Sequence, residues 1–585
     1  MELADRKPRA GRARLVILGA CLAVFFSAFE VLTPLVNFGI FNLTTSKLAA
    51  VFFFITVIAW STGNLRAVLR RRSLDLAVLL FVASNLISVP AAADKAGALK
   101  FALRMIYAAG VYFGVSRLPR RFRSHLVIGG TVTAAVLIVA IMGLMENFFI
   151  PVTWSWVLGP FQQEHASFGA FYNARIASTL PYPTSLSMYL ELTLPVALVF
   201  GVWLAERAST PWRRRGWLAA TIAGAAAVLV VQLLTFTRTS MVMAPLSLLL
   251  GLLLAAFFHY GRRVWMMLAV AAGIFLIALG GSLLFSNKMA VRLDLKQQAN
   301  KYGASYTLND FPAQLRPGEK ASAEISIKNT GTFTWGRRGS DDEVSLFFRW
   351  LTYPDGKQQN VPFIITYLPR SVPPGGTVDV KADFNTPSLP GKYVLYFDLA
   401  HIHRTWFSAA GVPELKVPVE FTGSAGAPFV IPPSSSNVDV PEPGVVATPR
   451  SALWRAAIDI WRSHPVLGIG PDQFRQNYAG YIHVTPDDRI RTHNIFLEAL
   501  VNTGLIGLLA MIYLLGAAAW VLFRLIRNRQ ADRSYRLFAI AIMIGLLAYA
   551  GHGLLDYFLW QTGISFLFFA LLGLAAWMDK TGSWF

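Results

Sequence analysis

The sequence predicts an all-α polytopic membrane protein that carries one inserted β-sandwich domain. Three observations support this fold class. Of the 585 residues, 55% are hydrophobic and only 15% are charged, and a soluble domain of that composition would expose aggregating patches. Twelve apolar runs reach the length that crosses a bilayer. The long break between the ninth and tenth runs instead carries short alternating segments separated by Gly and Pro turns.

The apolar runs predict about twelve transmembrane helices. They lie near residues 15–36, 46–63, 74–90, 98–116, 125–149, 183–205, 216–235, 240–260, 264–286, 494–523, 536–555 and 561–579. Every second linker is basic, namely 66–72, 117–123, 207–215, 262–263 and 524–536. Basic linkers stay in the cytoplasm, so both termini are predicted to be cytoplasmic. The net charge of +21 therefore indicates orientation and not a nucleic-acid partner.

Five domains or segments are expected along the chain. They are a transmembrane unit at 1–290 with helices one to nine, a β domain at 303–423, a Pro/Ser/Gly-rich linker at 424–449, a helical loop at 450–493, and helices ten to twelve at 494–585. The order of the helices places everything between 287 and 493 outside the cytoplasm. The single cysteine, Cys21, excludes an internal disulfide framework, so the outer domain depends on its own core.

The β domain is predicted to be an immunoglobulin-like sandwich. Alternating apolar and polar residues mark strands at 323–327, 344–348, 377–380, 392–397 and 415–419. Short strands at this spacing are typical of such sandwiches. The segment 329–335 reads N-T-G-T-F-T-W and resembles an N-T-G-T-x-x-W pattern of bacterial immunoglobulin-like modules.

The most informative motif precedes the tenth predicted helix. Here His493 and Asn494 are followed, after nine residues, by the Gly504-x-x-Gly507 pair. This arrangement resembles the signature of the bacterial O-antigen ligase and polymerase family. Three further segments are similar to the family, namely a Pro-x-x-Gly-x-Gly turn within 461–471, the turn 235–240, and the approach to the sixth helix at 175–195. The resemblance covers roughly 1–290 and 445–585 and leaves out the β domain.

The resemblance implies a glycosyltransferase. Members of this family take a glycan from undecaprenyl diphosphate on the outer side of the bacterial inner membrane and pass it to an acceptor hydroxyl. They do so in a GT-C-like helical fold, without a metal or other cofactor. By the same resemblance, His493 is the motif histidine, and Arg238 and Arg450 match the two essential arginines. A polysaccharide polymerase and a protein O-oligosaccharyltransferase of the same family are the alternatives.

These residue types suit the implied chemistry. Transfer from a diphosphate requires cations for the departing phosphate and a base for the acceptor proton. Arginine binds phosphate oxygens through two parallel donors and stays charged. An imidazole, with an unperturbed pKa of about 6.5, is a neutral base at neutral pH. His493 also precedes a helix, where unsatisfied backbone N–H groups favour an anion.

Each of these three residues also has an interpretation without catalysis. A lone His at a helix start is usually a cap, and only the surrounding motif favours function for His493. Arg238 in a tight outer turn is alternatively an anchor at the membrane surface, although outer cations oppose the positive-inside bias. Arg450 follows Pro449 at a predicted helix start, where a solvated Arg is common.

Further cations are candidates for substrate binding. Arg175 lies on the outer approach to the sixth predicted helix. Arg491 and Arg489 lie near His493 and either contact phosphate or supply only loop charge. Lys100 and Arg104 are one turn apart near the outer end of the fourth predicted helix, so they share a face.

Lys100 and Arg104 have two uses that the sequence does not separate. They hold the lipid diphosphate, or they pair with an intramembrane acid, for which Glu30 and Glu191 are available. Pairing is slightly favoured. Gly504 and Gly507 are most simply close-packing positions on their helix.

Metal dependence is disfavoured by the early outer loops. Metal-using membrane glycosyltransferases place paired acids there, whereas residues 42–47 contain none and 91–97 contain only Asp94. The exception is the pair Asp487 and Asp488, which lies close to His493. We therefore expect no metal and no cofactor.

The sequence fits a transporter or a sensor less well than an enzyme. A transporter of lipid-linked glycans usually shows two related halves with broken helices in matching places, and no such repeat is found. A sensor would not need twelve helices merely as an anchor. The expected partners are the lipid-linked glycan donor, membrane lipids, and an acceptor that is lipid A core, a growing polysaccharide or a protein hydroxyl.

Overall fold

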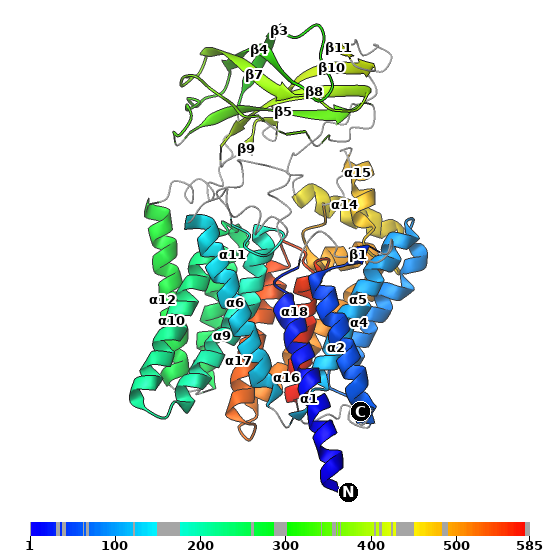
Figure 1. The fold of residues 1–585 in the computed structure, drawn as a ribbon, viewed down its shortest axis with the longest axis vertical. Coiled ribbons are helices and arrows are strands. Elements are labelled where there is room, and N and C mark those ends of the chain that lie inside the picture. Colours follow the sequence, from blue (N-terminus) through cyan, green and yellow to red (C-terminus); the bar gives the residue numbers. More distant parts are fainter. Residues whose placement is uncertain are drawn as a thin grey trace.

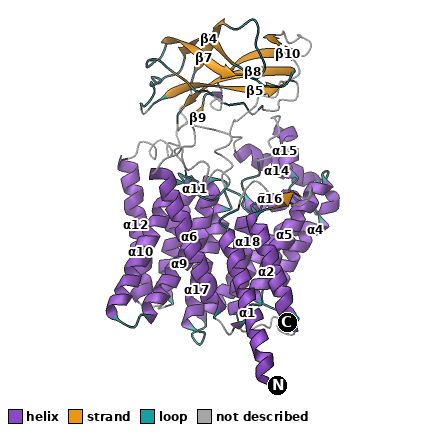
Figure 2. Ribbon diagram, in the orientation of Figure 1, coloured by secondary structure: helices purple, strands orange, loops and turns teal. Residues whose placement is uncertain are grey.

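The computed structural model of the protein consists of a helical bundle and a β domain (Figures 1 and 2). It describes residues 2–30, 36–37, 42–62, 64–65, 69–120, 123–148, 176–258, 262–285, 301–340, 342–353, 359, 361–362, 364–402, 405–408, 412–422, 425–428, 450–482 and 490–579. The predicted site residues Arg175 and Arg489, the acidic pair at 487–488 and most of the linker 424–449 lie outside this set.

Each of the twelve predicted apolar runs contains a helix. The helices are α1 (Glu2–Phe26), α2 (Thr45–Ser61), α4 (Asp75–Ile87), α5 (Lys95–Ser116), α6 (Ser124–Phe148), α9 (Pro183–Arg207), α10 (Pro211–Leu234), α11 (Arg238–Phe257), α12 (Arg262–Phe285), α16 (Ile495–Arg527), α17 (Arg533–His552) and α18 (Thr562–Met578). The first helix differs most from its predicted bounds of 15–36, because it begins in the basic segment before the apolar run and ends at Phe26, and residue 36 begins a short strand.

Several of these helices are suited to a membrane. Among the described residues, α5, α6, α9, α10, α16 and α17 are long and apolar enough to cross a bilayer. Shorter apolar helices occur at Thr45–Ser61, Asp75–Ala91, Arg238–Leu254, Ala269–Gly281 and Thr562–Met578. The protein is therefore a mostly helical membrane protein, and the count of twelve spanning helices stays a prediction.

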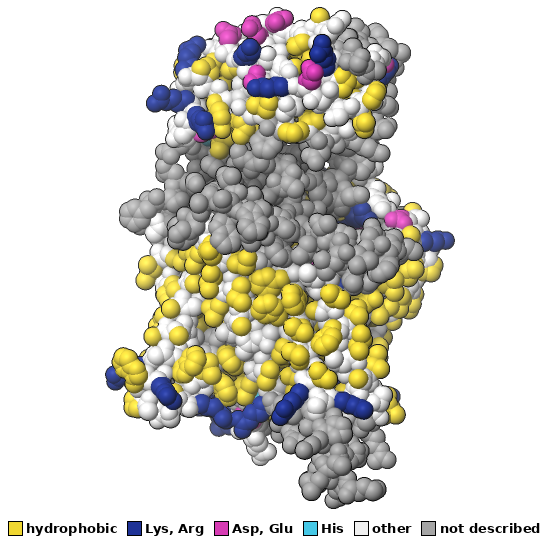
Figure 3. Space-filling view, in the orientation of Figure 1, with side chains coloured by type: hydrophobic (Ala, Val, Ile, Leu, Met, Phe, Trp, Pro, Cys, Tyr) yellow, Lys and Arg dark blue, Asp and Glu magenta, His cyan; other side chains and the backbone are white. Residues whose placement is uncertain are grey.

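The surface of the bundle separates apolar and basic side chains. On the face in view, Figure 3 shows hydrophobic side chains over the bundle, with Lys and Arg at its end away from the β domain. Exposed members of the basic linkers include Arg70, Arg71, Arg213 and Arg215. This is the distribution on which the predicted orientation depends.

Helix α18 lies at the centre of the bundle. All of its residues are buried, and it packs against α5, while the largely buried α9 packs against α17. A helix that is apolar all round needs neighbours on every side. The loop that precedes α18, residues 553–561, is therefore fixed at one end by a buried helix.

The β domain consists of two antiparallel sheets that share one core. The strands are β3 (Ala304–Asp310), β4 (Lys320–Asn329), β5 (Val344–Thr352), β6 (Thr366–Tyr367), β7 (Thr377–Asn385), β8 (Gly391–His401), β9 (Thr405–Trp406), β10 (Leu415–Thr422) and β11 (Ala425–Pro428). One sheet has the order β3-β4-β7 and the other β11-β10-β8-β5-β6, with β9 beside β8. In register, Ile325 pairs with Val380, and Phe348 pairs with Phe397.

All five predicted strand segments lie within observed strands, and the immunoglobulin-like assignment stays a prediction. The predicted boundary at 423 needs a correction, because β11 pairs with β10 and extends the sheet to Pro428. Two short strands, β1 (Val36–Asn37) and β2 (Asn42–Leu43), form a hairpin between α1 and α2. Helices α14 (Arg450–Ser463) and α15 (Phe474–Ile482) lie at the end of the bundle nearer the β domain (Figure 1).

Candidate active site

Helix α16 carries the motif and is kinked at Gly504. This residue has φ +65° and ψ −164°, a backbone conformation that a side chain would oppose. A Cβ atom there would lie 2.1 Å from the carbonyl oxygen of Val466. The kink therefore brings the helix backbone directly against the segment 465–470, which contains the Pro-x-x-Gly-x-Gly turn.

The turn replaces the helical hydrogen bonds that the kink removes. Backbone bonds join the two segments at Leu505 N to Pro465 O (2.9 Å), Ile469 N to Val501 O (3.1 Å) and Gly470 N to Asn502 O (2.9 Å). Backbone groups inside a protein must be paired, so the two glycine motifs form the two halves of one junction. Gly504 is therefore more than the close-packing position that the sequence predicted.

His493 lies immediately before α16 in a left-handed conformation, with φ +51°. Histidine adopts this region more readily than most residues. The next residue, Asn494, is the N-cap, and its Oδ1 accepts from the N–H groups of Phe496 (2.9 Å) and Leu497 (3.0 Å). The cap satisfies these two N–H groups, and the imidazole is left 31% exposed beside it.

The partner of His493 is Asp556, on the loop between α17 and α18. Nδ1 of the imidazole lies 3.1 Å from Oδ1 of the carboxylate, whose side chain is 13% exposed. Burial raises the pKa of the Asp556 carboxyl, but the hydrogen bond and charge of His493 and the charge of His552 lower the pKa, and the net result lies below the ordinary value. An ionised Asp556 accepts a hydrogen bond from Nδ1–H, and in the neutral imidazole this leaves the lone pair on Nε2.

A second acid–imidazole pair lies behind the first. His552 Nδ1 is 3.0 Å from Glu191 Oε2, and both side chains are 1% exposed. Glu191 also accepts from Gln232 at 3.2 Å. Glu191 therefore pairs with His552, and not with Lys100 or Arg104 as one predicted alternative had it.

The C-terminal end of α17 joins the helices that carry the predicted residues. The Gly553 carbonyl accepts from Ile495 N at 2.7 Å, and the Leu554 carbonyl accepts from the Asn494 amide at 3.0 Å. On the other side, the Met243 sulfur of α11 lies 2.7 Å from where a Cβ on Gly551 would be. The start of α11 and the start of α16 thus meet the same end of α17.

Arg238 and Arg450 are each the first residue of a helix, α11 and α14 respectively. Arg238 is the first residue of α11, follows the strained Phe236 (φ +47°), and is exposed. Arg450 is the exposed first residue of α14. Four residues later, Trp454 donates from its indole N–H to the carbonyl of Thr492 at 2.9 Å. Since residues four apart share a helix face, Arg450 lies on the side of α14 that contacts the His493 segment.

A series of buried hydrogen bonds connects the His493 segment with helix α16 and with the loop before α15. Glu498, which is 2% exposed, accepts from both the backbone N–H (2.9 Å) and the hydroxyl (2.8 Å) of Thr492. It also accepts from the Asn502 amide at 2.9 Å. In turn, Asn502 Oδ1 accepts from the N–H groups of Gln473 (3.1 Å) and Phe474 (2.9 Å). The position of His493 is therefore coupled to the loop before α15.

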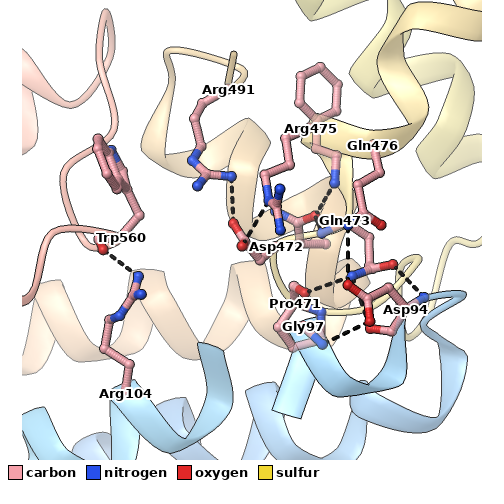
Figure 4. Close-up of polar contacts among 12 residues, drawn as sticks. Asp94, Gly97, Arg104, Pro471, Asp472, Gln473, Arg475, Gln476, Arg491 and Trp560 are labelled. Atoms are coloured by element: carbon pink, nitrogen blue, oxygen red, sulfur yellow. Dashed lines mark hydrogen bonds and ion pairs between the residues drawn. The ribbon is translucent and has the colours of Figure 1, made fainter. Parts of the chain in front are cut away.

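The same loop is joined to α5 through Asp94 (Figure 4). Gln473 Oε1 accepts from the Asp94 N–H at 3.0 Å, and Gln476 donates to Oδ2 of Asp94 at 3.2 Å. Asp94 also caps α5 by accepting from Gly97 N at 2.9 Å. This hydrogen bond is the largest of the effects that lower the pKa of Asp94, so its carboxylate is ionised in the contact.

Arg491 and Arg104 lie near each other around Trp560 (Figure 4). The Arg491 guanidinium lies over the Trp560 ring, 5.4 Å from its centroid, and Arg104 donates to the Trp560 carbonyl. Arg491 also forms an ion pair with Asp472 at 2.5 Å. Of the predicted substrate-binding residues, Arg491, Lys100 and Arg104 are described, and the structure brings Arg491 and Arg104 together beside the His493 loop.

Lys100 lies one turn before Arg104 on α5 and is exposed. Glu30, the other predicted acidic partner, accepts from the Thr44 hydroxyl at 3.1 Å and from Gly563 N at 3.0 Å. It is close enough to interact electrostatically with Arg104 and Lys47. Glu30 therefore attracts Arg104 electrostatically, while its carboxylate accepts hydrogen bonds from Thr44 and Gly563.

Several site residues were missed by the sequence reasoning. They are Asp556, Asp472, Arg475 and Glu498, although Glu498 lies within the His493–Gly507 motif and Asp472 directly follows the 461–471 turn. The available signal for Asp556 was its place, since it is an acid in the short loop between two apolar segments, four residues after His552. Among the described residues, no group of three His, Cys, Asp or Glu is placed to hold a metal ion.

A comparison with known protein families finds a match in the segment that contains His493. Residues 442–512 match the family model described as O-antigen ligase, and this segment contains α14, α15, His493 and the Gly504 junction. The match confirms the resemblance predicted from the motif. No curated protein matches the chain. Arg104, Arg238 and Asp556 lie outside the matched segment.

Proposed function

We propose that this membrane protein, which carries an O-antigen ligase domain at residues 442–512, transfers a glycan from undecaprenyl diphosphate to an acceptor hydroxyl. The reaction takes place on the outer side of the bacterial inner membrane, where the β domain also lies, with both termini in the cytoplasm. The observation that carries the proposal is the His493–Asp556 pair, because it gives a base with a defined proton-accepting atom.

The transfer makes one bond and breaks one bond. The acceptor oxygen attacks the anomeric carbon of the donor while its proton passes to Nε2 of His493. The bond between the anomeric carbon and the phosphate oxygen breaks, and both of its electrons leave with the diphosphate. Asp556 stabilises the imidazolium that forms, since its carboxylate accepts from Nδ1–H.

The departing diphosphate needs positive charge, which Arg238 and Arg450 supply in this proposal. Guanidinium groups bind phosphate oxygens in pairs and cannot lose their charge near neutral pH. Their position supports the role, because α11 and α14 both contact the segments that hold His493. We propose that arginines take the place of a metal ion in this reaction.

The direct test is transfer by the purified full-length protein. It is incubated with an undecaprenyl-diphosphate-linked glycan and, in separate reactions, lipid A core, a polysaccharide chain and a serine-containing peptide, all with EDTA. A product with the glycan joined to one acceptor, absent with His493→Ala, is expected. The acceptor that reacts separates a ligase from a polymerase or a protein-modifying enzyme.

Two outcomes contradict the proposal. Release of free glycan without a joined product would indicate a hydrolase. Activity that is lost in EDTA and restored by Mg²⁺ or Mn²⁺ would show that a metal is required, and would direct attention to Asp487 and Asp488.

A further inference from the structure

The carboxylate of Asp472 is surrounded by arginines (Figure 4). Arg491 Nη1 lies 2.5 Å from its Oδ1, and Arg475 Nε donates to its Oδ2 at 3.0 Å. Arg104, which reaches up from α5, is close enough to interact electrostatically with Asp472 and Arg491. The side chains of Asp472, Arg475 and Arg491 are 14%, 17% and 10% exposed. Two guanidinium groups therefore contact this nearly buried carboxylate, and a third lies close enough to feel its charge.

Asp472 does not satisfy the hydrogen bonding of Arg491. This arginine is 8% exposed, and its Nε and Nη1 atoms are buried with no hydrogen-bond partner among the described residues. Its short contact with Asp472 is thus an attraction of charges without hydrogen-bond geometry, and Oδ1 of Asp472 is unsatisfied as well. Buried polar groups without partners are rare in native proteins. The guanidinium has donors available for a ligand with more oxygens than one carboxylate.

The neighbouring charges leave the site positive. The cations are Lys47, Lys100, Arg104, Arg475 and Arg491, and the acids are Glu30, Asp94, Asp472 and Glu498. Five cations thus face four acids, all near the end of the bundle at which α14 and α15 lie. Cations at the outer end of membrane helices oppose the usual charge bias, so an excess there indicates an anionic ligand.

We propose that Arg104, Arg475 and Arg491 form a phosphate-binding site in which Asp472 occupies the place of a ligand oxyanion. A phosphate offers three oxygens to the arginine donors, where the aspartate offers two. Asp472 has φ +64°, a left-handed conformation that aspartate adopts more readily than most residues and that fixes the direction of its side chain. When phosphate binds, the Asp472 side chain gives up its place.

The phosphate belongs to a membrane lipid. Arg104 lies in the third turn of the apolar helix α5, with exposed Lys100 one turn nearer the helix start. A phosphate that reaches Arg104 therefore lies at the level of lipid headgroups. The identity of this lipid rests on the proposed function: it is the diphosphate of the donor or a phosphate of a glycolipid acceptor. The anion site itself does not depend on glycan transfer.

Binding to the full-length protein in phosphatidylcholine nanodiscs tests the site. The probes are undecaprenyl diphosphate, lipid A and inorganic pyrophosphate, and the dissociation constant is measured by native mass spectrometry. Arg491→Ala and Arg104→Ala are expected to weaken binding of the recognised lipid by about 10-fold or more, since each removes a charge-assisted hydrogen bond. Asp472→Asn is expected to tighten it several-fold, because the competing carboxylate is gone.

The matched control is Asp459→Asn, which removes the carboxylate of the exposed Arg462–Asp459 pair on α14 and should leave binding unchanged. Tight binding of undecaprenyl diphosphate alone assigns the site to the donor, and tight binding of lipid A alone assigns it to the acceptor. Pyrophosphate bound as well as either lipid would overturn the assignment to a membrane lipid. Should Arg491→Ala fail to fold, Arg491→Lys takes its place.

The arginine variants should weaken binding of the lipid, whereas Asp472→Asn should strengthen it. Asp472→Asn that weakens binding as much as Arg491→Ala would show that the pair is only a structural contact. Because no glycan is transferred in this assay, its result is independent of the proposed activity. A protein that binds lipid phosphate but fails to transfer glycan would leave the site standing and remove the function.

Discussion

The imidazole of His493 and the carboxylate of Asp556 meet at 3.1 Å, although they belong to different loops separated by 63 residues. His493 is placed by the cap of α16, and Asp556 by the buried helix α18 that follows its loop. Both supports are rigid, which a catalytic pair requires, since small displacements of reacting groups are costly in rate. The pair leads to the first prediction.

Asp556→Asn should slow glycan transfer by about 10²-fold or more, within the usual range for loss of a general base. An amide can present N–H to Nδ1 and so favour the tautomer whose Nε2 carries the hydrogen. That tautomer cannot accept the acceptor proton. Single-turnover rates measure the effect, and donor affinity, measured separately, should stay close to wild type. Equal losses of donor affinity and rate would show that Asp556 merely holds the loop.

Arg238→Ala and Arg450→Ala should each abolish transfer, and the corresponding Lys variants should recover little of it. A lysine keeps the charge but cannot form two parallel hydrogen bonds with a phosphate. Arg462→Ala is the matched control, because Arg462 is an exposed arginine at the other end of α14 and forms an ion pair with Asp459. Initial rates with the purified variants test this. Full activity in either Lys variant would mean that the guanidinium geometry is not used.

Gly504→Ala should destabilise the protein, whereas Gly516→Ala on the same helix should not. At Gly504 the added Cβ meets the Val466 carbonyl at 2.1 Å, and φ is +65°. The combination of φ +65° and ψ −164° is one that glycine alone adopts readily, and it costs about 1–3 kcal/mol for a residue with a side chain. With the added clash, the loss of unfolding free energy should exceed ~2 kcal/mol. At Gly516 nothing lies within 4 Å of the added atom. Thermal unfolding in detergent gives the melting temperature of each variant. Similar melting temperatures would show that the close contact between Gly504 and segment 465–470 is not needed for stability.

The orientation can be tested with single cysteines in a background where Cys21 is replaced by Ala. A cysteine at the exposed Ser340 in the β domain should react with an impermeant thiol reagent in intact spheroplasts. A cysteine at the exposed Ser209, between α9 and α10, should react only after the membrane is opened. The reverse pattern would invert the assigned topology.

Much of the fold could be predicted from the sequence, because the hydrophobicity of a segment depends only on its own residues. Each apolar run contains a helix, and each predicted strand segment lies in a strand. The misplaced boundaries have local causes as well. The first helix includes charged residues that hydropathy assigns to a flanking segment, and β11 is a short strand without an alternating pattern.

The site could be predicted only in part, because its contacts connect segments that are distant in the sequence. The motif identified His493, and its neighbour Arg491 was considered for that reason alone. Asp556 and Asp472 became visible only when the fold placed them against His493 and Arg491. The role of Gly504 was underestimated for the same reason, because the segment that fills its kink lies more than a helix length away in sequence.

The pH dependence of the single-turnover rate tests the central claim, that His493 accepts the acceptor proton. The pKa of Asp556 lies below its ordinary value, so between pH 5 and 8 the aspartate stays ionised and does not shape the profile. Acidification protonates an imidazole, and a protonated imidazole is no base. The wild-type rate should therefore fall on acidification, and His493→Gln, which lacks a proton-accepting nitrogen, should be slower by about 10²-fold or more at pH 8. A wild-type rate that rises as the pH is lowered, or a Gln variant close to wild type, would contradict the account.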